Sequence, residues 1–152
     1  MSTIEQPAYA SVTRDDTIEI RDYPALVVAE VTRRGARQAA VRAGFSPLAG
    51  YIFAKSREGE TVSMTSPVIQ TPTQANDQSW LIRFVMPSKY TLETLPKAAG
   101  EDVRLLELPA ARRAAIRFSG TATDALIAQN EAMLRAWLAQ RAIAIQGAPT
   151  YA

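Results

Sequence analysis

The sequence predicts an α+β fold in which one antiparallel sheet or barrel carries two flanking helices. Three observations predict it. Segments with apolar residues at every second position occur in both halves of the chain, as expected of strands. Each half also contains one amphipathic helical pattern. Finally, residues 18–25 (IEIRDYPA) are echoed 85 positions later by residues 103–110 (VRLLELPA), with matching apolar positions and a shared Pro-Ala ending.

This repeat suggests a duplicated strand-strand-helix-strand unit. In each half, a pair of predicted strands is followed by a helix and then by more strand. Two such units close most simply as one antiparallel sheet or barrel with both helices on its outside. The alternative is a chance match, because Pro-Ala is common after an amphipathic strand.

The first predicted elements are two strands. Residues 17–23 alternate, with Ile18 and Ile20 on one side, and a second strand follows at residues 26–32. Pro24 marks the turn between them. We expect these two strands to form a hairpin.

A helix is predicted at residues 36–53. Its apolar stripe, at spacings of four, three and four residues, consists of Val41, Phe45, Leu48 and Ile52. Pro47 interrupts the stripe. Because Ser46-Pro47 resembles an N-cap followed by a first-turn proline, the helix either kinks or restarts there.

The rest of the chain contains further strands and a second helix. Strands are predicted at residues 62–71, 80–86, 103–108 and 113–118, and the helix at residues 123–141. The polar segment 72–78 contains Pro, Asn and Asp, which favour a hairpin loop between the first two of these strands. A short strand-like tail ends at Tyr151-Ala152.

Length and composition predict one soluble domain over residues 1–152. The chain is 47% hydrophobic and 21% charged, which is ordinary for a globular domain with a single core. No segment approaches the ~18 consecutive apolar residues of a membrane span. The N-terminus has neither the basic start nor the apolar run of a signal peptide. We therefore expect a cytoplasmic protein that does not bind membranes.

The chain contains no cysteine and no histidine. This excludes disulfides, thiolate nucleophiles, Cys/His zinc sites and His-based catalytic triads. No catalytic residue and no metal ligand is predicted, and we expect a protein that is not an enzyme. The net charge of +2 does not by itself indicate nucleic-acid binding, because what matters there is the clustering of charge on one face. The few aromatic residues are also not interleaved with the basic ones as in a stacking platform for single strands.

Positive charge gathers around the first predicted helix. No acidic residue lies between Glu30 and Glu58, whereas six basic residues do: Arg33, Arg34, Arg37, Arg42, Lys55 and Arg57. A flat apolar ligand with carboxylates at its edge, such as haem or another porphyrin, would find guanidinium partners here. It would also find an apolar wall, formed by Phe45, Leu48, Ala49 and Ile52. The alternative is that this wall is simply core and the arginines a solvated face.

Four blocks of sequence, in order, resemble the bacterial members of the SOUL family of haem-binding proteins. They are residues 18–25, the Tyr-Ile-Phe turn at residues 51–53 with Met-Thr-Ser-Pro-Val at residues 64–68, residues 84–90 (FVMPSKY) and residues 118–120 (FSG). In the family, a Tyr-Ile-Phe-like turn precedes a Met-Thr-Ala-Pro-Val strand, and a later strand ends in Phe-Val-Met-Pro-Ser-Lys-Tyr. The resemblance extends from about Tyr9 to the C-terminus.

The resemblance implies a distorted barrel with a tetrapyrrole cleft beside the first helix, apolar within and basic near the propionates. By position, the family's helix arginine matches Arg42, a bulky pocket residue matches Phe45, and the aromatic residue at the helix end matches Tyr51. The expected cofactor-binding residues are Arg37, Arg42, Phe45, Leu48, Ala49, Tyr51, Ile52 and Met64.

Iron ligands are a separate question. Met64 and Met86 carry thioethers, yet both lie in strand patterns where a methionine more often fills a core gap. Tyr51 could ligate ferric iron as a phenolate, although such tyrosines more often pack their ring inward.

We therefore expect a protein that binds haem or metal-free porphyrin non-covalently, as a carrier, buffer or sensor, without a histidine iron ligand. One alternative is a protein-interaction module of the same fold with incidental haem affinity. Another, by fold analogy, is a small-molecule effector or hydrolase-like barrel, for which Glu30 in the middle of a predicted strand is the acid to inspect.

Overall fold

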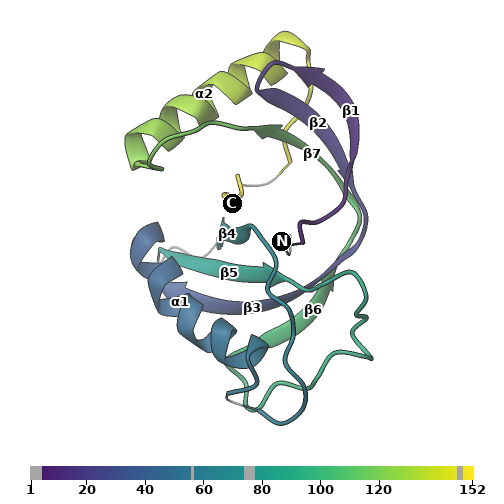
Figure 1. Ribbon diagram of the computed structural model, residues 1–152. Coiled ribbons are helices and arrows are strands. Elements are labelled where there is room, and N and C mark those ends of the chain that lie inside the picture. Colours follow the sequence, from purple (N-terminus) through teal and green to yellow (C-terminus); the bar gives the residue numbers. More distant parts are fainter. Residues whose placement is uncertain (1–4, 56, 74–77, 147–148) are drawn as a thin grey trace. The chain divides into compact units, whose positions relative to one another are not determined.

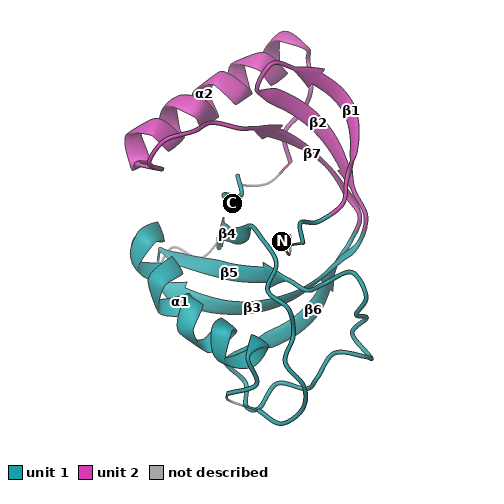
Figure 2. Cartoon of the chain, in the orientation of Figure 1, with its two compact units in different colours: residues 1–7, 25–109, 148–152 teal, residues 8–24, 110–147 magenta. Residues whose placement is uncertain are grey.

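The computed structural model describes residues 5–55, 57–73, 78–146 and 149–152. The chain divides into two compact units, coloured separately in Figure 2. Unit 1 consists of residues 1–7, 25–109 and 148–152, and unit 2 consists of residues 8–24 and 110–147. Each unit is therefore assembled from segments that are far apart in the sequence.

Unit 1 is a four-stranded antiparallel sheet covered by one helix (Figure 1). The strand order is β4-β5-β3-β6. Its elements are β3 (Leu26–Arg34), α1 (Arg37–Ile52), β4 (Val68–Pro72), β5 (Ser79–Val85) and β6 (Arg104–Leu108).

The core of unit 1 lies between α1 and the central strands β3 and β5. Val31 on β3 is opposite Ile82 on β5, and both side chains face α1 at Gly44. A Cβ atom at Gly44 would lie 2.9 Å from Cγ2 of Val31 and 3.0 Å from Cγ1 of Ile82. Glycine at this position therefore lets the helix approach the sheet closely.

Pro47 lies inside α1, which runs as one helix from Arg37 to Ile52. Of the two alternatives predicted at Ser46-Pro47, a restart of the helix is therefore wrong, and a kink stays a prediction. A proline removes one backbone hydrogen bond, but the helix is also held by its buried face, which includes Gly44 and Leu48.

Unit 2 is a three-stranded antiparallel sheet of order β1-β2-β7 with one helix packed on it. Its elements are β1 (Ala10–Asp15), β2 (Ile18–Tyr23), β7 (Ala111–Ile116) and α2 (Asp124–Gln140). The core contains Ile18 and Ile20 from β2 with Trp137 and Leu138 from α2. The indole N–H of Trp137 also donates a 2.8 Å hydrogen bond to Asp15, which ties α2 to the end of β1.

The predicted hairpin of residues 17–23 and 26–32 is wrong, although both strands exist. β2 pairs with β1 and β7, whereas β3 pairs with β5 and β6. Two of the crossings between the units fall at the repeated Pro-Ala dipeptide, between Pro24 and Ala25 and between Pro109 and Ala110. Proline cannot donate to a strand ladder, so each dipeptide interrupts the pairing where the chain changes sheet.

Other predicted elements are close to the observed ones. The predicted strand 62–71 is shorter in the structure, because β4 begins only after Pro67. Four residues of the predicted loop 72–78, residues 74–77, lie outside the described residues. The C-terminal tail forms a single antiparallel bridge between Tyr151 and Gln70.

The α+β class with two helices and antiparallel sheets is confirmed. Strand pairing runs within two separate sheets, so the closed barrel stays a prediction, as does the single domain. In the part of the chain that the structure describes, no helix is both long and apolar enough to span a membrane.

Candidate functional site

A solvent-open hollow of about 540 Å³ lies along the second half of α1 and the turn that follows it. It is lined by Phe45, Ser46, Pro47, Ala49, Gly50, Phe53 and Lys55. Phe45, Ala49 and Phe53 follow one another at spacings of four residues, so they share one flank of the helix. The volume lies within the range of about 300–1,000 Å³ that is typical of small-molecule sites.

Two phenylalanine rings form the apolar wall of this α1 hollow. Phe45 is 43% exposed and Phe53 is 45% exposed, which is high for two neighbouring aromatic residues. The ring of Phe45 packs edge-on against the buried ring of Phe84, with 5.7 Å between the ring centroids. The core therefore holds Phe45 in place while leaving part of its ring available to a ligand.

Two cations accompany the phenylalanines. Lys55 lines the hollow, and Arg42 lies one helical turn before Phe45 and Ser46 on the same flank. Both side chains are exposed, and within the described residues neither has a hydrogen-bond or ion-pair partner. They are therefore available to pair with a carboxylate.

Other members of the basic cluster have partners within unit 1. Arg33 forms a bidentate pair with Asp102, at 2.8 and 2.6 Å, and this pairing lowers the pKa of Asp102. Arg57 donates to the backbone carbonyls of Glu58 and Glu60, and its guanidinium lies 4.7 Å from the ring centroid of Tyr51. The positive charge that remains available is thus concentrated near the hollow.

Three of the predicted site residues lie on the inner face of α1. Leu48, Tyr51 and Ile52 are almost completely buried in the core of unit 1. The Tyr51 hydroxyl donates a hydrogen bond to the carbonyl of Pro96, and burial raises the pKa of Tyr51. The structure therefore holds this side chain as a neutral phenol rather than as a phenolate.

Two further predicted residues also lie away from the hollow. Arg37, in the first turn of α1, donates a 3.0 Å hydrogen bond to the side chain of Gln70 on β4. Met64 is partly buried against the core of unit 1. Of the eight predicted residues, the hollow thus brings together Phe45 and Ala49, with Arg42 on the same flank. The role of each of the eight stays a prediction.

Sequence reasoning missed Phe53 and Lys55 as site residues. Phe53 follows the last residue of α1 and lies outside the apolar stripe. An aromatic residue outside the stripe is the feature of the sequence that could have indicated a binding surface here. Lys55 was visible only as one member of the basic cluster. Neither feature shows on which side of the helix the hollow lies.

Glu30 does occupy a buried position. It lies on the central strand β3, and one of its carboxylate oxygens is 3.6 Å from Nε of Arg83 on β5. Neither of these two atoms has a hydrogen-bond partner among the described residues. Within the residues that the structure describes, no group of three or more acidic residues could hold a metal ion.

The fold is that of a small α+β protein, and the α1 hollow combines two half-exposed phenylalanine rings with an exposed lysine. A family model described as SOUL heme-binding protein matches residues 4–152. The chain therefore belongs to the SOUL family of haem-binding proteins. Among curated proteins, no relative matches the sequence.

Proposed function

We propose that this protein binds haem or metal-free porphyrin non-covalently in the α1 hollow and acts as a carrier, buffer or sensor rather than as an enzyme. The observation that supports this most is the combination of two half-exposed rings, Phe45 and Phe53, with the exposed Lys55 in one hollow. Membership of a haem-binding family supports the same ligand class.

Apolar contact supplies the first part of the binding energy. Fully burying a phenylalanine side chain contributes about 1.5–3 kcal/mol. Phe45 and Phe53 are each a little under half exposed, so covering both with a porphyrin face is worth about 2 kcal/mol in total. Ala49 lies between the two rings along the helix flank and leaves room for a flat ligand.

Carboxylate pairing supplies the second part. Lys55 lines the hollow and Arg42 lies one helical turn before Phe45, so each of two propionates has a candidate cation. Both side chains are exposed, which limits each pair to about 0.2–1 kcal/mol. The pairs therefore orient the ligand more than they anchor it.

The residues that line the hollow do not require the metal. The chain has no histidine and no cysteine, and among the described residues that line the hollow the polar side chains are those of Ser46 and Lys55. Apolar contact and carboxylate pairing act equally on haem and on metal-free porphyrin. We therefore expect protoporphyrin to bind within about tenfold of haemin, a difference of roughly 1.4 kcal/mol.

Absorption titrations with haemin and with protoporphyrin test this proposal. Phe53→Ala and Lys55→Glu should both weaken the binding of either ligand, and Arg42→Glu should weaken it less. Leu92→Ala and Lys97→Glu are matched controls, because both residues are exposed in unit 1 and lie outside the hollow. Titration curves unchanged by Phe53→Ala and Lys55→Glu would place the ligand elsewhere.

The spectrum of the haemin complex tests the second part of the proposal. A much tighter haemin complex with a sharp six-coordinate low-spin spectrum would show that a side chain ligates the iron. In that event Lys55, Met64, Met86 and Tyr51 are the first residues to substitute, and metal-independent binding would be wrong.

A further inference from the structure

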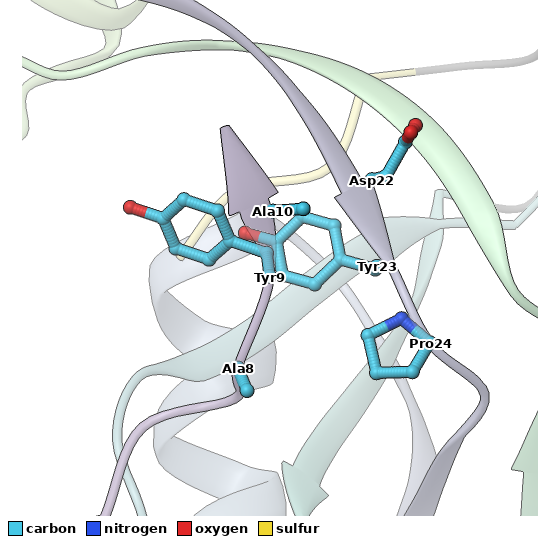
Figure 3. Close-up of a pocket in the computed structure, with 6 residues that line it drawn as sticks. All are labelled: Ala8, Tyr9, Ala10, Asp22, Tyr23 and Pro24. Atoms are coloured by element: carbon cyan, nitrogen blue, oxygen red, sulfur yellow. The ribbon is translucent and has the colours of Figure 1, made fainter. Parts of the chain in front are cut away.

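A second hollow, of about 380 Å³, lies in unit 2 where the chain enters β1 and leaves β2 (Figure 3). We call it the tyrosine hollow, and it is lined by Ala8, Tyr9, Ala10, Asp22, Tyr23 and Pro24. It shares no residue with the α1 hollow. The proposed tetrapyrrole site therefore does not account for it.

The two tyrosine rings are held in place by a partly buried ion pair. Their centroids are 5.2 Å apart at an interplanar angle of 46°. The guanidinium of Arg21 lies 4.2 Å from the ring centroid of Tyr9 and donates a 2.9 Å hydrogen bond to the hydroxyl of Tyr23. Arg21 is itself anchored by a 2.7 Å hydrogen bond to Glu19, which is only 4% exposed. Unit 2 thus fixes both rings before any ligand binds.

The charges around the tyrosine hollow are paired. Glu19 compensates Arg21, and Arg112 binds the carboxylate of Asp22 through two hydrogen bonds of 2.7 and 2.8 Å. Figure 3 shows the Asp22 carboxylate pointing away from the two tyrosine rings. The surface offered to a ligand is therefore uncharged, and it consists of aromatic rings, a proline ring and alanine methyl groups.

The two phenol groups remain able to donate hydrogen bonds. The Tyr23 hydroxyl accepts its bond from Arg21, so its own proton is free for an acceptor. The hydroxyl of Tyr9, a residue that is 37% exposed, has no hydrogen-bond partner among the described residues. The tyrosine hollow therefore combines flat apolar surface with two O–H donors.

We propose that the tyrosine hollow binds an uncharged proline-rich segment of a partner protein. A polyproline II segment has no internal hydrogen bonds, so its carbonyl groups can accept from Tyr9 and Tyr23. Its rings pack on aromatic side chains, and its preformed shape reduces the entropy lost on binding. Because the hollow is open and its rim charges are paired, it suits an extended neutral chain better than an enclosed or charged ligand.

Addition of a strand to β1 would be a different mode of binding, and the structure disfavours it. β1 is an edge strand, but its register with β2 shifts between Ser11 and Thr13, which leaves Val12 as an extra residue. Such an irregularity protects an edge against further pairing. A partner segment is therefore expected on the tyrosine rings rather than in the sheet.

Amide NMR of the isotope-labelled protein tests the proposal, with an octaproline peptide blocked at both ends as the probe. We expect saturable shifts of the amide signals of Tyr9, Ala10, Asp22 and Tyr23. A blocked Gly-Ser peptide of equal length is the control and should cause none. Tyr9→Ala should weaken binding at least fivefold, or roughly 1 kcal/mol. Tyr9→Phe keeps the ring and separates the hydroxyl's contribution from that of the ring.

Three results would overturn the proposal. One is the absence of saturable shifts with octaproline, and another is equal binding by Tyr9→Ala with its fold intact. The third is a response of the same amides to a Val-Thr strand peptide or to haemin, which would assign the hollow to strand addition or to tetrapyrrole binding. The first two results leave the porphyrin titrations of the α1 hollow unaffected, whereas a haemin response of these amides would also bear on where the tetrapyrrole binds.

Discussion

Gly44 sets the distance between α1 and its sheet. The helix has no side-chain N-cap and no acidic residue in its first turn, so its position depends on packing rather than on end effects. Leu48 and Ile52 supply that packing from the inner face. Phe45 and Phe53, on the adjacent flank, are then left half-exposed as the wall of the α1 hollow.

Gly44→Ala should lower the free energy of unfolding by about 1 kcal/mol. Alanine favours a helix by about 1 kcal/mol over glycine, but overpacking a core typically costs about 1–3 kcal/mol. The added Cβ would lie 2.9 Å from Val31, so the steric cost prevails. Urea unfolding measures the loss. In a Val31→Ala background the same change should be less harmful, and an equal loss in both backgrounds would contradict the clash.

Asp102 should contribute a small pH-dependent stability. Hydrogen bonding from Arg33 lowers the pKa of Asp102 in the folded state, so its contribution is complete above the ordinary aspartate pKa of about 3.9 and is lost as the pH falls further. Because the side chain of Asp102 is 56% exposed, we expect only about 0.2–1 kcal/mol. Asp102→Asn should be less stable than the wild type at pH 7, with a smaller difference at pH 3. A difference independent of pH would exclude this pair as its source.

The two helices differ at their first residues. Thr123 caps α2 by accepting a hydrogen bond from the backbone N–H of Leu126, and Asp124 places negative charge in the first turn. Ala36, at the start of α1, has extended backbone angles that suit a cap but no side chain to supply one. The start of α1 is therefore weaker than that of α2.

Removing the cap of α2 and adding a cap to α1 should change the free energy of unfolding in opposite directions. Thr123→Ala should reduce the free energy of unfolding by about 1 kcal/mol, whereas Ala36→Asp should increase it by about 0.5–1 kcal/mol. Thermal and urea unfolding of both variants measure the effects. A loss of stability in Ala36→Asp would show that the environment of the first turn disfavours a carboxylate.

At the scale of the whole molecule, the units are interleaved along the chain. Unit 2 takes β1 and β2 from residues 8–24 and β7 and α2 from residues 110–147, and the largest segment of unit 1, residues 25–109, lies between them in the sequence. Neither unit can be cut out as one continuous segment. We therefore expect the chain to unfold as one cooperative domain.

The two tryptophans allow this expectation to be tested, because Trp80 lies in unit 1 and Trp137 in unit 2. In Trp137→Phe the fluorescence reports on unit 1, and in Trp80→Phe it reports on unit 2. Within each variant, the fluorescence and circular dichroism transitions should coincide. Separate transitions would show two independently unfolding domains.

Most of the local elements and the family can be predicted from the order of the residues alone. Both helices lie within one or two residues of their predicted bounds, because helical periodicity is a property of neighbouring residues. Blocks such as residues 84–90 likewise identify the family without any knowledge of the fold.

The tertiary structure alone decided the strand partners and the position of the candidate site. β1 was not predicted, because all six of its residues are exposed and the strand shows no buried alternation. Without β1, residues 17–23 were paired with their nearest neighbour instead of with β7, which lies about 90 residues away. Strand pairing and the exposed flank of a helix depend on contacts between distant segments. The tertiary structure therefore decided that Leu48 is core whereas Phe45, three residues earlier, lines the hollow.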